Sequence, residues 1–163
     1  MNALKKLLAT PNDPLLTVLR LTLGIIFLAH GAQMTLGLSG GHGLSGTMHF
    51  FATDLHIPAP LAFVAIMAQF LGSIGLILGL ASRLAALSIV GNMVVAIVMV
   101  HEQFGLFMNW FGTQKGEGYE YHLLAIAVAL PIIFRGAGAL SIDRLLANLP
   151  ARDVHPNAIP SLG

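Results

Sequence analysis

Three histidines lie near the ends of long apolar runs, where few side chains can change charge. His30 ends the first run, His101 ends the third, and His122 begins the fourth. An imidazole can hydrogen-bond a quinone, exchange a proton near neutral pH, or ligate a metal ion or haem iron. The residue type and its placement therefore predict a quinone, proton-transfer or metal site at one end of a set of helices.

Other polar residues occur at the same level of the chain. Gln33 follows His30 by three residues, so the two share one face of a helix. Glu120 stands two residues before His122, where a carboxylate can orient an imidazole or relay its proton. We therefore expect His, Gln and Glu side chains to line a polar pocket near the outer leaflet.

Two amide side chains are expected to lie deeper in the membrane than these histidines. Gln69 and Asn92 each stand nine residues inside an apolar run, which is about 13 Å at 1.5 Å per residue. They are expected to hydrogen-bond one another between helices or to contact a ligand. Arg20, at the inner start of the first run, is expected either to anchor that end or to contact a cofactor.

These observations give three sets of candidate residues. The candidate catalytic residues are His30, His101 and Glu120; the candidate cofactor-binding residues are Arg20, Gln33, Gln69, Asn92 and Tyr119; and the candidate metal ligands are His30, His101 and His122. The alternative is that outer histidines only satisfy helix ends and loop carbonyls. No HxxxH or CxxCH spacing strengthens the metal or haem prediction, and the absence of cysteine excludes a cysteine-ligated cluster or a dithiol pair.

Helices in a membrane must position these residues. The chain is 56% hydrophobic and 9% charged, with a mean hydropathy of +0.81, whereas soluble domains are about 25% charged. So few charges suit a surface that faces lipid. A net charge of +1 provides no basic patch, so the chain is not expected to bind nucleic acid.

The apolar runs predict an all-α, transmembrane four-helix bundle, because about 20 helical residues cross a bilayer. We expect spans at about residues 15–36, 60–80, 83–102 and 121–140, outer loops at 37–59 and 103–120, a cytoplasmic segment at 1–14 and a cytoplasmic tail at 143–163. Of the eight Lys and Arg residues only Lys115 falls in an outer loop, so both termini are predicted to be cytoplasmic.

Shorter features refine this plan. Residues 37–46 are rich in glycine and are predicted to form a loop, and residues 47–56 are predicted to form an amphipathic helix at the membrane surface. Within the second span, Ala68, Gly72, Gly75 and Gly79 form two small-xxx-small steps that let helices approach closely.

Several short motifs follow one another in a fixed order: RLTLG at 20–24 with AHGAQ at 29–33, FF at 50–51 through IPAP at 57–60, LGL at 78–80 through RLAA at 83–86, VH at 100–101, GYEY at 118–121 and GALSID at 138–143. In this order and spacing, over about residues 14–144, they resemble the DoxX family. The resemblance implies a small bacterial or archaeal membrane protein with four helices.

The resemblance also implies site residues and chemistry. The family's recurrent polar positions correspond to Arg20, His30, Gln33, His101 and Glu120, and Gln69 stands where relatives often have a glutamate. Some members are linked to thiosulfate:quinone oxidoreduction, and others to membrane complexes that handle thiols or oxidative stress. Because an amide does not titrate, any proton step at the glutamate position would be missing in this chain.

We therefore expect an inner-membrane, quinone-linked component of an oxidoreductase, with quinone as cofactor and redox partner proteins that supply electrons. One alternative is a non-catalytic docking or assembly subunit that binds partners through the aromatic loop at 104–111. A third is metal or small-molecule binding or transport, with a metal or haem in place of quinone. Whether the chain assembles with further copies of itself is left open.

Overall fold

A computed structural model of the protein describes residues 3–149, which contain helices and loops and no strand. The helices are α1 (Ala3–Leu8), α2 (Pro14–Leu36), η1 (Leu38–Gly40), α3 (Gly43–Thr53), α4 (Ala59–Leu78), α5 (Ser82–Ala96), η2 (Ile97–His101), η3 (Glu102–Phe104), α6 (Glu120–Arg135) and α7 (Ile142–Ala147). Arg152 and the rest of the predicted tail from residue 150 lie outside the described residues. The expected all-α class is confirmed.

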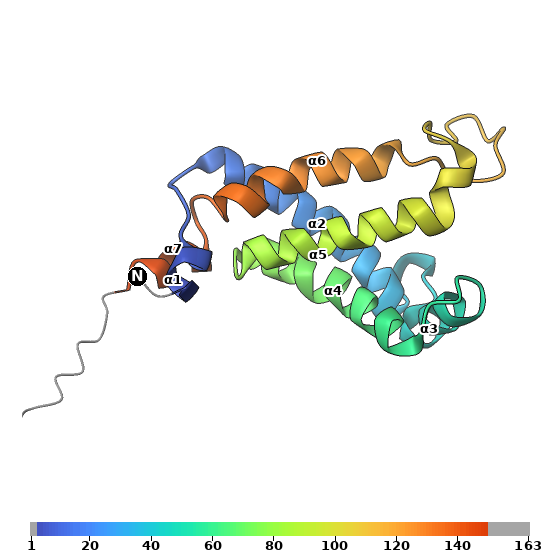
Figure 1. The fold of residues 1–163 in the computed structure, drawn as a ribbon, viewed down its shortest axis with the longest axis horizontal. Helices are drawn as coiled ribbons and strands as arrows, with labels where there is room; N and C mark the ends of the chain where they lie inside the picture. The colour runs from blue at the N-terminus through green and yellow to red at the C-terminus, as the bar shows by residue number, and fades with distance from the viewer. Residues whose placement is uncertain (1–2, 150–163) are drawn as a thin grey trace, which may run out of the picture.

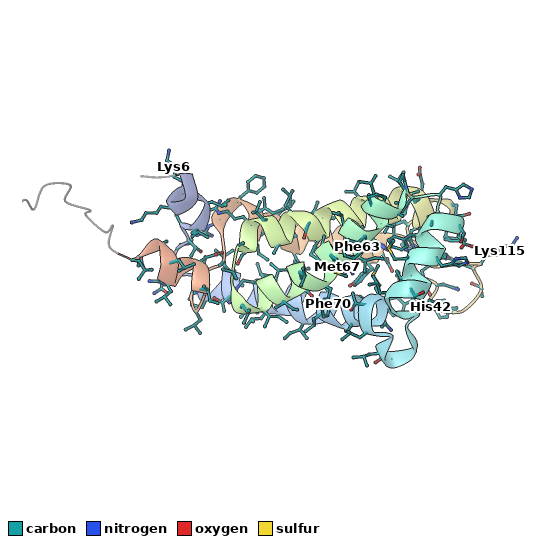
Figure 2. All side chains as sticks on the ribbon, turned by 90° about the horizontal axis from the view of Figure 1, so that it is seen from below. Lys6, His42, Phe63, Met67, Phe70 and Lys115 are labelled. Carbon is teal, nitrogen blue, oxygen red and sulfur yellow. The ribbon has the colours of Figure 1, made fainter. Side chains whose placement is uncertain are left out.

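Four helices run lengthwise and form an elongated bundle (Figure 1). Helix α2 packs on α4 and α6, and α5 packs on α4 and α6. Short helices α1 and α7 pack together at one end, whereas α3 and the loop before α6 lie at the other (Figure 1). Figure 2 shows Lys6 at the first end, and His42 and Lys115 at the opposite end.

Three stretches of helix are long and apolar enough to cross a membrane: residues 14–36, 59–78 and the joined helices at 82–104. The chain is thus a multi-pass membrane protein. Helix α6 has 16 residues, or about 24 Å, and is shorter than a usual span. A fourth crossing and the direction of the termini remain predictions; the end that carries α1 and α7 is called inner and the end that carries α3 outer, after the predicted orientation.

Local signals set the helix ends. Asp13 caps α2 by accepting hydrogen bonds from the backbone N–H groups of Leu15 and Leu16, at 2.9 and 3.4 Å. Helices α2 and α4 end at Gly37 and Gly79, whose φ angles of 70° and 68° favour glycine. The predicted ends of these two helices agree with the structure to within two residues.

Two helices have bounds that differ from those expected from the sequence. Helix α6 ends at Arg135 and not near residue 140, because Gly136 and Gly138 have φ angles of 94° and 79°, which a helix cannot continue. Helix α3 begins at Gly43, inside the predicted loop, and ends at Thr53. Packing against α2 and α4 outweighs the low helix propensity of its glycines, and the Thr47 hydroxyl donates to the carbonyl of Met34 at 3.0 Å.

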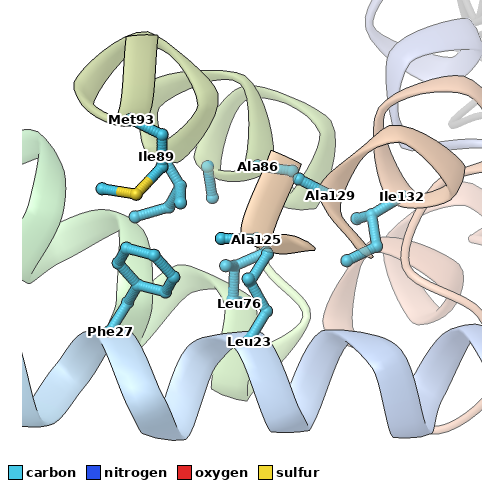
Figure 3. Packing of buried hydrophobic residues seen from close by; sticks show 10 residues of the cluster. Leu23, Phe27, Leu76, Ala86, Ile89, Met93, Ala125, Ala129 and Ile132 are labelled. Carbon is cyan, nitrogen blue, oxygen red and sulfur yellow. The ribbon is translucent and has the colours of Figure 1, made fainter. Parts of the chain in front are cut away.

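Small residues bring the helices together. Figure 3 shows Leu23 and Phe27 of α2 facing Leu76 of α4, side chains of α5, and the alanines of α6. A Cβ atom on Gly31 would lie 2.9 Å from the Cα of Phe70, so α2 and α4 are in close contact there. As predicted, Gly72 of α4 lies at a close approach, against Ser88 of α5, but the glycines on α2 were not predicted.

Candidate functional site

The described part of the bundle holds a cavity of about 250 Å³ in its outer half, between α2, α3, α4 and the joined helix α5–η2. Three of its lining residues are polar: Gln69, Asn92 and His101. The rest are apolar, namely Met34, Phe50, Phe51, Leu55, Ile57, Ala65, Met93, Val95, Ala96, Met99 and Val100. A concave, mostly apolar site with a few polar groups is the usual form of a small-molecule site.

The cavity lies just beneath the lateral surface of the molecule. Phe50, Val95 and Met99 line it and are 42%, 45% and 41% exposed, so the cavity is not sealed off from the surface. Residues 82–104 form one of the stretches long and apolar enough to cross a membrane, so the exposed parts of Val95 and Met99 belong to an apolar helix suited to lipid. The arrangement suits a ligand that is itself dissolved in lipid.

The predicted pairing of Gln69 with Asn92 is present. The amide nitrogen of Asn92 donates to the side-chain oxygen of Gln69 at 3.1 Å and to the carbonyl oxygen of Ala65 at 2.9 Å. Gln69 is buried, with 6% of its surface exposed. The two amides therefore join α4 to α5 and also stand in the wall of the cavity, so both predicted roles remain compatible with the geometry.

His101 ends a π-helical turn, η2, at the outer end of the third crossing stretch. Turns of this kind are frequent at functional sites. Its Nδ1 lies 2.8 Å from the carbonyl oxygen of Glu117 in the following loop. His101 therefore joins the wall of the cavity to the outer loop.

The three candidate histidines gather with Tyr121 at the outer end of the bundle. The rings of His101 and His122 are 4.2 Å apart between centroids, and the ring of Tyr121 is 5.6 Å from that of His122. His30 is exposed, and its ring lies 6.3 Å from that of Tyr121. His122 is buried, and neither its Nδ1 nor the Tyr121 hydroxyl has a hydrogen-bond partner among the described residues.

Proximity alone does not make a metal site. Among residues 3–149, no three His, Asp or Glu side chains are grouped so that they could hold one metal ion. The predicted ligand set of His30, His101 and His122 therefore has no support in the geometry of the described residues.

Glu120 and Tyr119 hold the outer loop. The Glu120 carboxylate accepts from the backbone N–H of Met108 at 3.0 Å and from the indole N–H of Trp110 at 3.1 Å. The backbone N–H of Tyr119, the residue that precedes α6, donates to the carbonyl of Gly105 at 3.2 Å. These bonds fix the loop between η3 and α6, and neither residue lines the cavity.

Gln33 and Arg20 do not line the cavity. Gln33 lines a shallower hollow beside His42, and its side chain donates to the carbonyl of Ser39 at 3.3 Å. Arg20 is 1% exposed at the opposite end of the bundle. Its guanidinium donates to four backbone carbonyls, those of Leu76, Ile77, Ala137 and Leu140.

Those bonds give Arg20 a structural function. They cap the carboxyl end of α4 and tie the segment before α7 to the bundle. Asp143 complements them, since its carboxylate accepts from the backbone N–H groups of Ala81 and Ser82 at 2.7 and 2.9 Å and so caps α5. The GALSID motif at residues 138–143 thus holds the helices together at the inner end of the bundle.

Sequence reasoning missed the apolar wall of the cavity. Phe50, Phe51 and Leu55 of the α3 region were recognised only as the apolar face of a surface helix, and the methionines Met34, Met93 and Met99 gave no signal at all. Several methionines around one cavity are a useful sign, because this flexible side chain adapts to ligands.

The comparisons with known proteins agree with the architecture. A family model described as DoxX matches residues 15–102. An uncharacterised protein of Haemophilus influenzae strain Rd is 30% identical over 135 residues, which cover 78% of this chain and 87% of that protein. A Bacillus subtilis strain 168 protein named "Putative oxidoreductase CatD" is 25% identical over 126 residues, 77% of this chain and 82% of its own.

No solved structure matches the chain. The family match covers more than half of the sequence, including α4 and nearly all of α2 and of the third crossing stretch. It therefore includes all three polar residues of the cavity, Gln69, Asn92 and His101. The chain belongs to the DoxX family.

Proposed function

We propose that this protein is the membrane component of a quinone-linked oxidoreductase and that its outer cavity binds the quinone head group. The cavity itself carries the proposal: about 250 Å³ of mostly apolar space, beneath a lipid-facing surface, with Gln69, Asn92 and His101 in its wall. This volume is slightly below the usual range of about 300–1,000 Å³ for ligand pockets, so it suits a single ring whose tail extends into lipid.

The polar residues present fit such a ligand. An amide and an imidazole supply hydrogen bonds to ring oxygens, and the apolar wall excludes water. A bound quinone would supply the redox chemistry. The protein's own residues would bind and orient the ring, while His101 and His122 would exchange protons toward exposed His30 at the outer end.

Electrons must come from elsewhere, because the chain has no cysteine and so no dithiol of its own. The relative named as an oxidoreductase supports a redox context for this family member. We place the protein in the inner membrane of a bacterium or archaeon, with four crossings and both termini in the cytoplasm. In that orientation the cavity lies near the outer leaflet.

Filling the cavity tests the proposal. Ala96 lines it, so Ala96→Phe should remove quinone that co-purifies with the wild-type protein, measured by solvent extraction and chromatography. Ala127→Phe, at an exposed position of α6, is the matched control and should keep it. Metal analysis and a visible spectrum on the same samples examine the alternative cofactors. Equal quinone content in Ala96→Phe and wild type would contradict the proposal.

An exposed aromatic surface on the outer loop favours a second function, the docking of a partner protein. Phe107, Trp110 and Phe111 of the outer loop are 66%, 78% and 91% exposed, and Glu120 holds the indole in place. A fixed aromatic surface suits the docking of a redox partner by a subunit that does no chemistry. Stoichiometric capture of an oxidoreductase by quinone-free protein, lost in Trp110→Ala with Phe111→Ala, would favour this function.

A further inference from the structure

The hydrogen bonds around the cavity determine which polar atoms it offers to a ligand. His101 lies with Nδ1 at 2.8 Å from the carbonyl oxygen of Glu117. A carbonyl oxygen only accepts, so Nδ1 must carry the hydrogen. In the neutral ring the lone pair is then on Nε2, which has no hydrogen-bond partner among the described residues, so the free polar atom of this cavity-lining residue is an acceptor.

The same reasoning identifies the oxygen and the nitrogen atom in each of the two side-chain amides. The Asn92 atom facing the carbonyl oxygen of Ala65 at 2.9 Å must be the nitrogen, and its second N–H is directed to Gln69 at 3.1 Å. The Gln69 atom that accepts this bond must be the oxygen. Asn92 therefore offers its oxygen, an acceptor, and Gln69 offers its amide nitrogen, a donor.

The cavity thus combines two acceptors with one donor. An oxidised quinone has only acceptor oxygens, so it can pair with Gln69 and leaves His101 and Asn92 without a donor. A hydroquinone has two hydroxyl groups, each of which donates and also accepts. It can donate to His101 or Asn92 and still accept from Gln69.

We propose that the cavity selects the reduced, dihydroxy form of its ligand over the oxidised form, and that the acceptor atoms of His101 and Asn92 determine this selectivity. The inference rests on the proposed function and narrows it to one redox state. Leaving a buried acceptor unpaired costs about one ordinary hydrogen bond, which corresponds to about a tenfold preference.

Three ligands of similar size test the inference on the intact protein in detergent: a decyl-substituted hydroquinone, the matching benzoquinone, and the dimethyl ether of the hydroquinone. Dissociation constants are measured anaerobically by equilibrium dialysis at about pH 8, where a histidine is normally neutral. The hydroquinone should bind about tenfold more tightly than the other two, because they have no hydroxyl donor.

The variant His101→Phe should weaken binding of the hydroquinone and so reduce its preference over the benzoquinone, because only the Asn92 acceptor remains, and should leave the affinity for the benzoquinone within about twofold. His49→Phe is the matched control, because His49 is exposed on α3 and does not line the cavity, and it should keep the preference. Equal affinities for the three ligands in the wild type would overturn the inference without any variant. Binding of none of them would overturn the proposed function as well.

Discussion

Some polar side chains in this protein take part in more than one interaction, and Asn92 is the clearest case. Its amide nitrogen bonds to Ala65 and to Gln69, and its side chain also lines the cavity. A polar group at this depth must be paired, because lipid offers no substitute for water. The pairing holds α4 against α5 and fixes which amide atoms remain for a ligand.

Asn92→Ala should therefore lower the free energy of unfolding. It removes both bonds and leaves the Gln69 oxygen unpaired, and comparable interhelical bonds contribute about 0.6–1.7 kcal/mol in membranes. Unfolding by denaturant in mixed micelles measures the change. Asn148→Ala, at an exposed residue after α7, should be neutral within about 0.5 kcal/mol. Equal stability of Asn92→Ala and wild type would refute the pairing.

Histidines show the limit of reasoning from single residues. Their type and level in the chain predicted that three of them lie at similar depth and left open whether they meet; in the structure His101 and His122 lie side by side. Sequence spacing could not say that His101 would face the cavity while His30 would face outward. The direction in which each histidine faces depends on the rotation of its helix and on the π-helical turn at Ile97–His101. No local sequence pattern predicted that turn.

At the scale of elements, glycine sets how closely helices pack. Gly31 of α2 faces backbone of α4, with a Cβ position 2.9 Å from the Cα of Phe70, whereas Gly91 of α5 has nothing within 4 Å of its Cβ position. The two glycines both stand inside long helices and look alike in sequence. Whether a methyl group is tolerated at either position depends on how close the facing helix lies.

Gly31→Ala should cost about 1–3 kcal/mol, because backbone cannot yield as a side chain can. Gly91→Ala should be neutral or stabilising by up to about 1 kcal/mol, since alanine is the better helix former. Thermal unfolding of both variants, purified in the same detergent, measures the contrast. Similar melting temperatures for the two would mean that α2 and α4 are not packed as described.

Element ends were largely readable from the sequence, because capping and left-handed glycines act locally. Asp13, Gly37 and Gly79 mark ends that the sequence predicts to within two residues. Where tertiary packing competes with propensity, as in glycine-rich α3, the prediction is wrong. The cavity could not be predicted for the same reason. The apolar residues in its wall are of the same types as packed core residues, and only the tertiary structure shows that an empty space faces them.

At the scale of the whole molecule, charge distinguishes the two ends. Lys5, Arg83 and Arg135 lie at the end that carries α1 and α7, where Arg135 pairs with Asp13 at 3.3 Å, and Lys115 lies at the other (Figures 1 and 2). The positive-inside rule predicts that the basic end lies in the cytoplasm. This orientation requires α6 to cross the membrane despite its 16 residues.

The absence of cysteine makes the topology directly measurable. Lys6→Cys, Lys115→Cys and Leu145→Cys each introduce one thiol at an exposed position. A membrane-impermeant maleimide should label position 115 in intact cells, and positions 6 and 145 only after the inner membrane is opened. Labelling of position 145 from outside would mean three crossings and would place α6 on the outer side.

The most direct test of the central claim is to locate a bound quinone. A quinone analogue with a photoreactive group on its ring would be cross-linked to the purified protein, and the labelled peptides identified by mass spectrometry. Binding in the cavity predicts label within residues 50–57 and 92–101, reduced by an excess of unmodified quinone and lost in Ala96→Phe. Label confined to the outer loop or spread evenly along the lipid-facing helices would contradict the claim.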